Sequence, residues 1–529
     1  MRRGSVLFCP RPGVWGHEGD DCVTTPDSSY AKPFLSVPEQ IRRLRSRGMD
    51  CGDDVYASSI LEKYGYYRLS GYWHIYRDPP EPPGPRFNDA GQEIRLDTFL
   101  PGTSLTRVVA LYEFDHELRG RLGDALSIIE TAFRFFIGHR LGRIGTFAHR
   151  DPEALGAMTR APQESPLLRT VPTTAYCEWL EEYDRHERRA KGDFVLHFRE
   201  HYGPHLPIWV ATEVMSFGLL SNLYKLMPQS DQEILAARFQ VHSADGRGDR
   251  GALANWLNSL RQLRNICAHY GRVWNRAFDV LIDAPGQARK SNEDLLAPLV
   301  DNRVNNKLYG VLLVMRYLLL SIDPADNSVA DLVRYIEQRS RDLGFGIGQL
   351  GFPQNWMQNP LWDRGFHIDR GPMVAASLLD RVDILTAAQT RATLTFAEPR
   401  PTAKSRTPEQ WAAAKRAAQK SLLRAYRSHE VVIEVELGGL RYYPSFQFRG
   451  GKIIDALAEI NKELLSSCTH LNGTDKARAL LDWWQTPLPN LVTNAIGGNQ
   501  SPLHLLNQVP EAQFEAIVQE AGALKTFNP

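Results

Sequence analysis

Three polar side chains at a short spacing, Arg264, Asn265 and His269, form the pattern in this chain that is richest in potential chemistry. On a helix at about 100° per residue, Asn265 and His269 share a stripe with Arg261 and Arg272, and Arg264 lies at its edge. The opposite face is apolar or weakly polar, with Leu260, Leu263, Ile266 and Cys267. One face of the predicted helix therefore gathers an imidazole, an amide and several guanidiniums.

These groups suit cleavage of a phosphodiester in RNA. Cleavage without a metal needs a base for the 2′-hydroxyl, an acid for the leaving 5′-oxygen and cations for the charged phosphorane. A histidine acts as base or acid near neutral pH, and an arginine matches two phosphoryl oxygens. We therefore predict that His269 is the general acid or base, that Arg264 stabilises the phosphorane and that Asn265 orients the imidazole.

A surface helix with an incidental histidine is the alternative interpretation, because the same arginine-to-histidine spacing recurs from Arg134 to His139. There, Glu130 and Arg134 are spaced as an ordinary ion pair on one helix face. Both residues nevertheless lie on a helix that we expect to pack beside the 251–276 helix. We therefore favour a structural ion pair and keep Glu130 and Arg134 as candidates for supporting groups at the site.

Weaker candidates for binding RNA phosphates lie elsewhere in the chain. Besides Arg261 and Arg272, they are Arg42 and Arg43 in a basic helix, and Arg68 among the aromatic residues 64–76. Aromatic rings beside a cation are able to stack bases, but we favour a packed junction between helices for this cluster. Charged helix faces are also usually only solvated.

Composition narrows the class of protein. The 529 residues exceed one ordinary core and predict two or three domains. A net charge of +1 restricts any nucleic-acid site to a local basic patch. Six cysteines without a CxxC pair favour reduced thiols over a disulfide framework or a zinc cluster. No apolar run is long enough to span a membrane, and no secretory signal is visible, so we expect a cytoplasmic protein.

Helical periodicity dominates the first two thirds of the chain, and strand patterns are nearly absent before residue 390. The strongest stripe covers 104–142. The other helices are expected at 36–48, 54–63, 173–201, 208–227, 230–239, 251–276, 303–321 and 328–342. A helix from about 407 to 428 and a valine-rich strand at 431–437 follow, with a possible strand at 392–396. The prediction is a mainly α protein with a smaller α+β C-terminal domain.

Several motifs in order resemble the Abi-like (abortive infection) family. They are KPFL at 32–35, YGYYRLSGYW at 64–73, LYEFDHELR at 111–119, RNICAHYGRVWNR at 264–276 and GFPQNWMQNPLW at 351–362. The resemblance implies a HEPN-type helical domain whose R-N-x3-H motif falls on Arg264, Asn265 and His269. It further implies metal-independent endoribonuclease activity without a cofactor, a homodimer whose active site uses both chains, and for some members a structured noncoding RNA.

The C-terminal region resembles the toxin-binding part of MbcA/ParS/Xre-type antitoxins. The resemblance rests on RYYPSFQF at 441–448, LDWW at 481–484 and SPLHLL at 501–506. The helix-turn-helix that usually precedes that region is not recognisable, which argues against a repressor. We expect this domain to restrain the nuclease, sense a trigger or recruit a protein partner.

The expected domains are an irregular segment at 1–30, an Abi-like HEPN domain at 31–363, a linker at 364–406 and an antitoxin-like α+β domain at 407–529. The expected function is an anti-phage endoribonuclease. The alternative is a non-catalytic RNA-binding or regulatory scaffold of a toxin–antitoxin system, with the same arginines gripping RNA phosphates.

Overall fold

The structure is a computed structural model. It describes residues 33–82, 84–85, 87, 93–160, 170–290, 294–368, 384–386, 390–391, 394, 408–437, 440–449, 452–471, 473–488, 491, 501–506, 509–520, 522 and 524. The segment predicted to be irregular at 1–30 and most of the predicted linker lie outside the described residues.

Most of the described chain is helical, so the predicted fold class, mainly α, is confirmed. The helices of the N-terminal body are α1 (Val37–Ser46), α2 (Asp54–Tyr64), α3 (Tyr66–Trp73), α4 (Leu105–Gly142), α5 (Thr174–Arg189), α6 (Asp193–Tyr202), α7 (Ile208–Val214), α8 (Phe217–Leu226), α9 (Gln229–Arg238), α10 (Arg250–Ala268), α11 (Leu308–Ile322) and α12 (Ser328–Leu343). The short 3-10 turn η1 (His74–Tyr76) follows α3, and three more, η4 (Ile347–Leu350), η5 (Trp356–Gln358) and η6 (Pro360–Trp362), follow α12.

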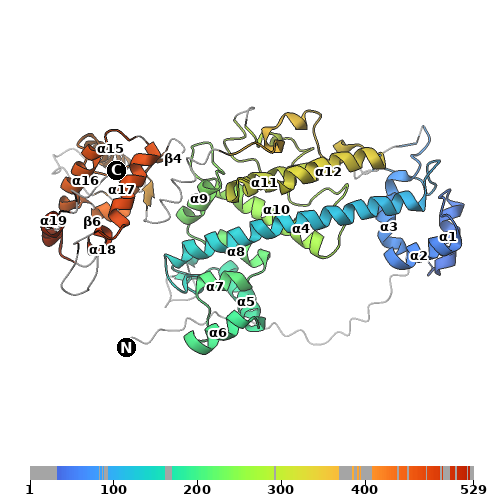
Figure 1. The fold of residues 1–529 in the computed structure, drawn as a ribbon, viewed down its shortest axis with the longest axis horizontal. Helices are drawn as coiled ribbons and strands as arrows, with labels where there is room; N and C mark the ends of the chain where they lie inside the picture. Colours follow the sequence, from blue (N-terminus) through green and yellow to red (C-terminus); the bar gives the residue numbers. More distant parts are fainter. Residues whose placement is uncertain are drawn as a thin grey trace.

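The 38-residue helix α4 is the central element of this body. At about 1.5 Å per residue it is roughly 57 Å long. It packs against α7, α10, α11 and α12, and Figure 1 shows α11 and α12 along one side of it and α5 to α8 along the other. The helices α1 to α3 lie at one end. One continuous hydrophobic core, from Ile41 to Ile368, joins these helices.

Local sequence signals explain where several helices begin. Ser104 caps α4 by accepting a hydrogen bond from the Arg107 backbone N–H at 3.2 Å. At α1, the Glu39 carboxylate accepts a hydrogen bond from the Ser36 backbone N–H at 2.7 Å, as the predicted capping box requires. The bounds of α4, predicted as 104–142, therefore agree closely with the structure.

Two predicted helices are interrupted. The helix expected at 173–201 is divided into α5 and α6, and the one expected at 208–227 is divided into α7 and α8. Ser216 caps α8 by accepting a hydrogen bond from Leu219 N–H, so a new helix starts inside what looked like one apolar stripe. A short antiparallel pair, β1 (Met158–Arg160) and β2 (Thr170–Pro172), was not predicted.

The segment expected to close the Abi-like domain, 351–362, packs into the same core through Leu361 and Trp362. Its backbone is held by Arg316, a fully buried arginine of α11, whose Nε donates to the Leu361 carbonyl at 2.9 Å. The core thus extends at least to Ile368.

The C-terminal region is α+β. Its helices are α15 (Pro408–Ser428), α16 (Asp455–Ser467), α17 (Gly473–Gln485), α18 (Pro502–Leu506) and α19 (Glu511–Glu520). Its strands are β4 (Val435–Leu437), β5 (Leu440–Pro444), β6 (Phe448–Arg449) and β7 (Lys452–Ile453). Strand β3 (Ile384–Thr386), from the predicted linker, pairs antiparallel with β5, and the sheet order is β3-β5-β4. Leu394, which lies in the possible strand predicted at 392–396, is not part of a strand.

Two sequence expectations concern cysteines and membranes. Cys51, Cys267 and Cys468 are free thiols, but Cys177 is disulfide-bonded, so the expectation of reduced thiols is wrong at that position. Sequence spacing does not reveal which sulfur atoms meet in space. None of the described helices combines the length and the apolar character that a membrane crossing requires.

Candidate functional site

The candidate site lies at the C-terminal end of α10. Asp249 caps the start of this helix by accepting a hydrogen bond from Ala252 N–H at 3.0 Å. Its buried face carries Leu253, Trp256, Leu257, Leu260 and Leu263. These residues belong to the body's core, and α10 packs against α4, α8 and α9. The core thus fixes which face of α10 is exposed.

The helix ends at Ala268, eight residues before the predicted end at 276. His269 is the C-cap residue, and Tyr270 follows in the left-handed region at φ +56°. The prediction that Arg272 lies on the helical stripe is therefore wrong. Its guanidinium instead donates to the Gly71 carbonyl of α3 and is partly buried.

Distant residues in the sequence hold the turn that follows α10. The buried Asp115 carboxylate of α4 accepts hydrogen bonds from the backbone N–H of Val273 at 3.2 Å and of Trp274 at 2.6 Å. It also accepts one from the Tyr72 hydroxyl at 2.6 Å and pairs with Arg119. These contacts turn the chain away from the helix axis and leave His269 at an exposed corner.

Burial raises the pKa of Asp115, while Arg119, Tyr72 and the two backbone amides oppose that effect. The pKa of Arg119 is raised because Asp115 and Tyr72 outweigh its own burial. Burial also raises the pKa of Cys267 to about 12. Since a thiol with such a pKa stays protonated, Cys267 is no nucleophile at neutral pH.

The structure brings Glu130 and Arg134 of α4 to Arg264. Glu130, with a side chain only 10% exposed, lies with Oε2 3.8 Å from Nε of Arg264 and with Oε1 2.6 Å from Arg134. Two guanidiniums thus share one carboxylate, so the cluster keeps a net positive charge. The Arg264 side chain is 43% exposed, which leaves it accessible to an anion from solvent.

Asn265 and His269 are linked through the backbone, because His269 N–H donates to the Asn265 carbonyl at 3.0 Å. Among the hydrogen bonds of the described residues there is none between their side chains. The amide of Asn265 is half-buried and the His269 ring is exposed. Both side chains can therefore turn toward a bound substrate.

Arg68, one of the weaker candidates, contacts the segment that directly follows the motif. Its Nη1 donates to the carbonyl of Tyr270, the residue after His269, at 3.5 Å. Tyr67, its exposed neighbour on α3, and Tyr270, 64% exposed, offer ring faces close by. Most other rings of the 64–76 cluster are packed, with Tyr72 stacked on Trp274.

The remaining arginine candidates do not all converge. Arg261 lies on α10 and donates to Asn258 of the same helix at 3.0 and 2.9 Å. Arg42 and Arg43 are exposed on α1, which packs on α2 rather than on α10. The site therefore groups Arg264, Asn265, His269 and Arg68, with Glu130 and Arg134 behind them.

Sequence reasoning missed Asp115, Arg119 and Tyr72 as positioning residues. The signal was a buried ion pair at i and i+4 on the apolar stripe of α4, where charged residues are rare unless paired. Among the residues that the structure describes, no cluster of histidine, cysteine and acidic side chains is arranged to hold a metal ion.

The fold and the site define a mainly helical protein with an exposed histidine and an arginine cluster of net positive charge at a helix end. Residues 59–275 match the family model described as Abi-like protein. This stretch contains the 64–73 and 111–119 motifs and residues 264–275 of the third motif. It covers less than half of the chain. The resemblance to Abi-like proteins is thereby confirmed there, and it suggests a role in abortive infection defence.

The match does not reach the C-terminal region, whose resemblance to antitoxins stays a prediction. No curated protein and no solved structure matches the chain.

Proposed function

We propose that this protein is a metal-independent endoribonuclease of abortive infection, with a HEPN-type site at the end of α10. His269 acts as general acid or base, Arg264 stabilises the phosphorane and Asn265 orients the reacting groups. The observation that carries the proposal is the arrangement at this corner. His269 is exposed at the end of α10, in the same short motif as Arg264. The buried Glu130 carboxylate lies 3.8 Å from the Arg264 guanidinium, and the exposed Arg68 donates to the carbonyl of Tyr270.

The chemistry follows from these positions. In the attack, the base takes the proton of the 2′-hydroxyl while its oxygen bonds to phosphorus. The P–O bond to the 5′-oxygen then breaks, and an acid protonates that oxygen. The products are a 2′,3′-cyclic phosphate and a free 5′-hydroxyl. Negative charge develops on the phosphorane oxygens in the transition state. Arginine donors placed at these oxygens therefore stabilise the transition state more than the bound substrate, and so lower the barrier.

One histidine cannot donate and accept a proton at the same moment. We therefore propose that two chains form a homodimer in which each supplies one R-N-x3-H motif to a composite site. The exposure of His269 and Arg264 leaves them available to a second copy.

The C-terminal domain is proposed to restrain this activity. Tyr442 of β5 lies within electrostatic range of Glu233 and Arg247 of the helical body, and burial raises its pKa to about 12. Arg247 belongs to the loop that leads into Asp249, the cap of α10. The charge of Arg247 therefore couples the tail electrostatically to the segment that begins the catalytic helix.

Expression of the wild type, His269→Ala and Arg264→Ala in bacteria tests the proposal. The nuclease predicts that either substitution relieves growth arrest and preserves cellular RNA. A non-catalytic RNA-binding scaffold predicts that His269→Ala keeps both RNA binding and its phenotype, while Arg264→Ala weakens them. Equal toxicity and equal RNA integrity in the wild type and His269→Ala would reject the nuclease.

A further inference from the structure

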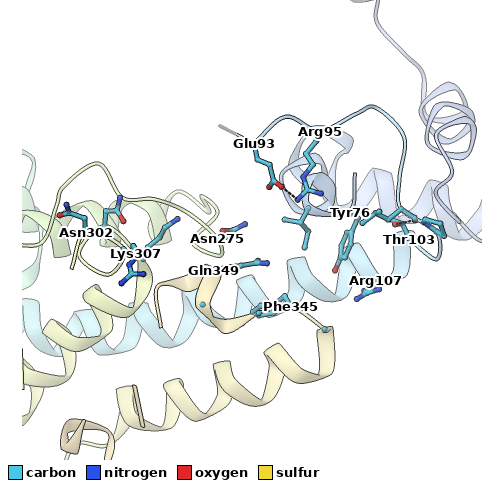
Figure 2. A pocket seen from close by; sticks show the side chains of 18 residues that line it. Tyr76, Glu93, Arg95, Thr103, Arg107, Asn275, Asn302, Lys307, Phe345 and Gln349 are labelled. Atoms are coloured by element: carbon cyan, nitrogen blue, oxygen red, sulfur yellow. Dashed lines mark hydrogen bonds and ion pairs between the residues drawn. The ribbon is translucent and has the colours of Figure 1, made fainter. Parts of the chain in front are cut away.

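A second polar site lies apart from His269, in a cavity of about 860 Å³. Its walls come from three segments that are distant in the sequence, as Figure 2 shows. One runs from η1 to the first turn of α4, one covers residues 302–307 ahead of α11, and one covers residues 344–349 after α12. Asn275, from the segment that follows α10, completes the lining.

The cavity wall is cationic. It carries the charged groups of Arg95, Arg107, Arg303 and Lys307 against the carboxylate of Glu93. Glu93 pairs with Arg95 at 2.8 Å. A wall with four cations and one anion favours a ligand with several negative charges, because field lines concentrate in a cleft lined by one sign of charge.

Lys307 is the cation that a ligand would neutralise most directly. Among the described residues it has no ion-pair partner, and burial alone lowers its pKa. A half-buried ammonium without a carboxylate is costly unless an anion joins it. Arg303, on the same wall, has a 90% exposed side chain that pairs with Asp301 at 2.7 Å.

Neutral groups in the same wall suit a nucleotide. Asn302, Asn306 and Gln349 offer amides, and the buried Asn306 Oδ1 atom has no hydrogen-bond partner within the described part of the chain. Tyr76 and Phe345 also contribute to the lining, but each is only 8% exposed. Gly346 and Gly348 leave open space where a side chain would stand, and the volume is in the range of small-molecule sites.

We propose that this cavity binds a nucleotide through its phosphate, with Lys307 and Arg303 on one wall and Arg95 and Arg107 on the other. The base would find hydrogen-bond partners in the amides of Asn302, Asn306 and Gln349. The same chemistry is offered by a free nucleotide and by the phosphate of an RNA strand. The site contains none of Arg264, Asn265 and His269, so it does not depend on cleavage.

Calorimetric titration of the full chain tests the proposal with ATP and with a short 2′-O-methyl oligoribonucleotide, which cannot be cleaved through its 2′ position. We expect Lys307→Ala to weaken binding of at least one probe by about tenfold or more, since it removes a charged contact. Arg303→Ala should weaken the same probe, and its exposure keeps the fold unaffected. Lys307→Arg should retain most of the affinity.

Lys225→Ala, an exposed lysine on α8 outside the lining, is the matched control and should change nothing. Loss of ATP binding assigns a free nucleotide, and loss of oligoribonucleotide binding alone assigns an RNA strand. The proposal is overturned if neither probe binds, if adenosine binds as tightly as ATP, or if Lys307→Ala and Arg303→Ala bind both probes like the wild type.

Discussion

Asp115 is a buried carboxylate that accepts hydrogen bonds from two backbone amides and a tyrosine hydroxyl and pairs with an arginine. Its partners Val273 and Trp274 lie 158 and 159 residues away in the sequence. The turn that they form sets where α10 stops and where His269 points. A single side chain on α4 therefore positions the candidate catalytic corner.

Asp115→Ala should lower the free energy of unfolding by about 3 kcal/mol or more, because it leaves Arg119 charged and buried without its partner. Chemical denaturation monitored by circular dichroism measures the change. Asp124→Ala removes an exposed carboxylate from the same helix and should stay within about 0.5 kcal/mol of the wild type. If both variants unfold like the wild type, Asp115 does not hold the turn.

The spacing of Arg264, Asn265 and His269 could be read from the sequence because a helix places these residues within about one turn. Glu130 was a candidate for a supporting group because two amphipathic helices were expected to pack side by side, and its carboxylate lies 3.8 Å from Arg264. The contact of Arg68 with Tyr270 and the hydrogen bonds from Val273 and Trp274 to Asp115 could not be predicted from the sequence. Both join atoms more than 150 residues apart, and no local pattern encodes such pairings.

At the scale of elements, α4 was predicted almost to the residue, whereas α10 was predicted eight residues too long. The stripe of α4 is long and its N-cap is local, so the information lies within the helix itself. The end of α10 depends on tertiary hydrogen bonds, because Asp115 of α4 binds the backbone that follows the helix. The break between α5 and α6 could not be predicted from the sequence either, because the amphipathic pattern continues from one helix to the other.

Two glycines of α4 separate the effect of helix propensity from that of packing. A Cβ at Gly138 would lie 3.1 Å from Thr212 Oγ1 and 3.3 Å from the Trp209 backbone of α7, whereas Gly123 has open space. We expect Gly123→Ala to raise the free energy of unfolding by about 0.5–1 kcal/mol. Gly138→Val should lower it by about 1–3 kcal/mol, because it forces α7 away from α4.

Denaturant unfolding of both glycine variants gives the comparison. Equal effects of the two substitutions would show that α7 does not approach α4 as closely as described. The pair also tests the central packing that carries Glu130 and Arg134 toward α10.

At the scale of the whole molecule, one buried histidine makes stability depend on pH. Burial, reinforced by Arg150, lowers the pKa of His149 to about 3 from its usual 6.5. The unfolded chain takes up this proton below about pH 6.5, while the folded protein does so only near pH 3. Stability is therefore lost as the pH falls through that window, by about 2 kcal/mol between about pH 7 and 5.

His149→Phe should flatten this part of the stability profile, as measured by denaturation at several pH values. His116→Gln, at an exposed position on α4, is the control and should keep the wild-type slope. Parallel profiles for His149→Phe and the wild type would contradict the assignment.

The proposed restraint by the C-terminal domain predicts that removal of residues 407–529 raises toxicity on expression. Arg247→Ala should give a smaller effect in the same direction, because it removes one of the charges that act electrostatically on Tyr442. Growth curves and RNA integrity measure both. Unchanged or lower toxicity after the deletion would count against an inhibitory tail.

The central claim is that His269 takes part in metal-independent RNA cleavage, and the chemistry of the product ends tests it most directly. Purified wild-type protein is incubated with a labelled RNA in the presence of EDTA, and the ends are analysed beside those from His269→Ala. The account predicts 2′,3′-cyclic phosphate ends from the wild type and a loss of about a hundredfold or more in rate for the variant. Equal cleavage by the two proteins, or cleavage that stops when EDTA is added, would contradict it.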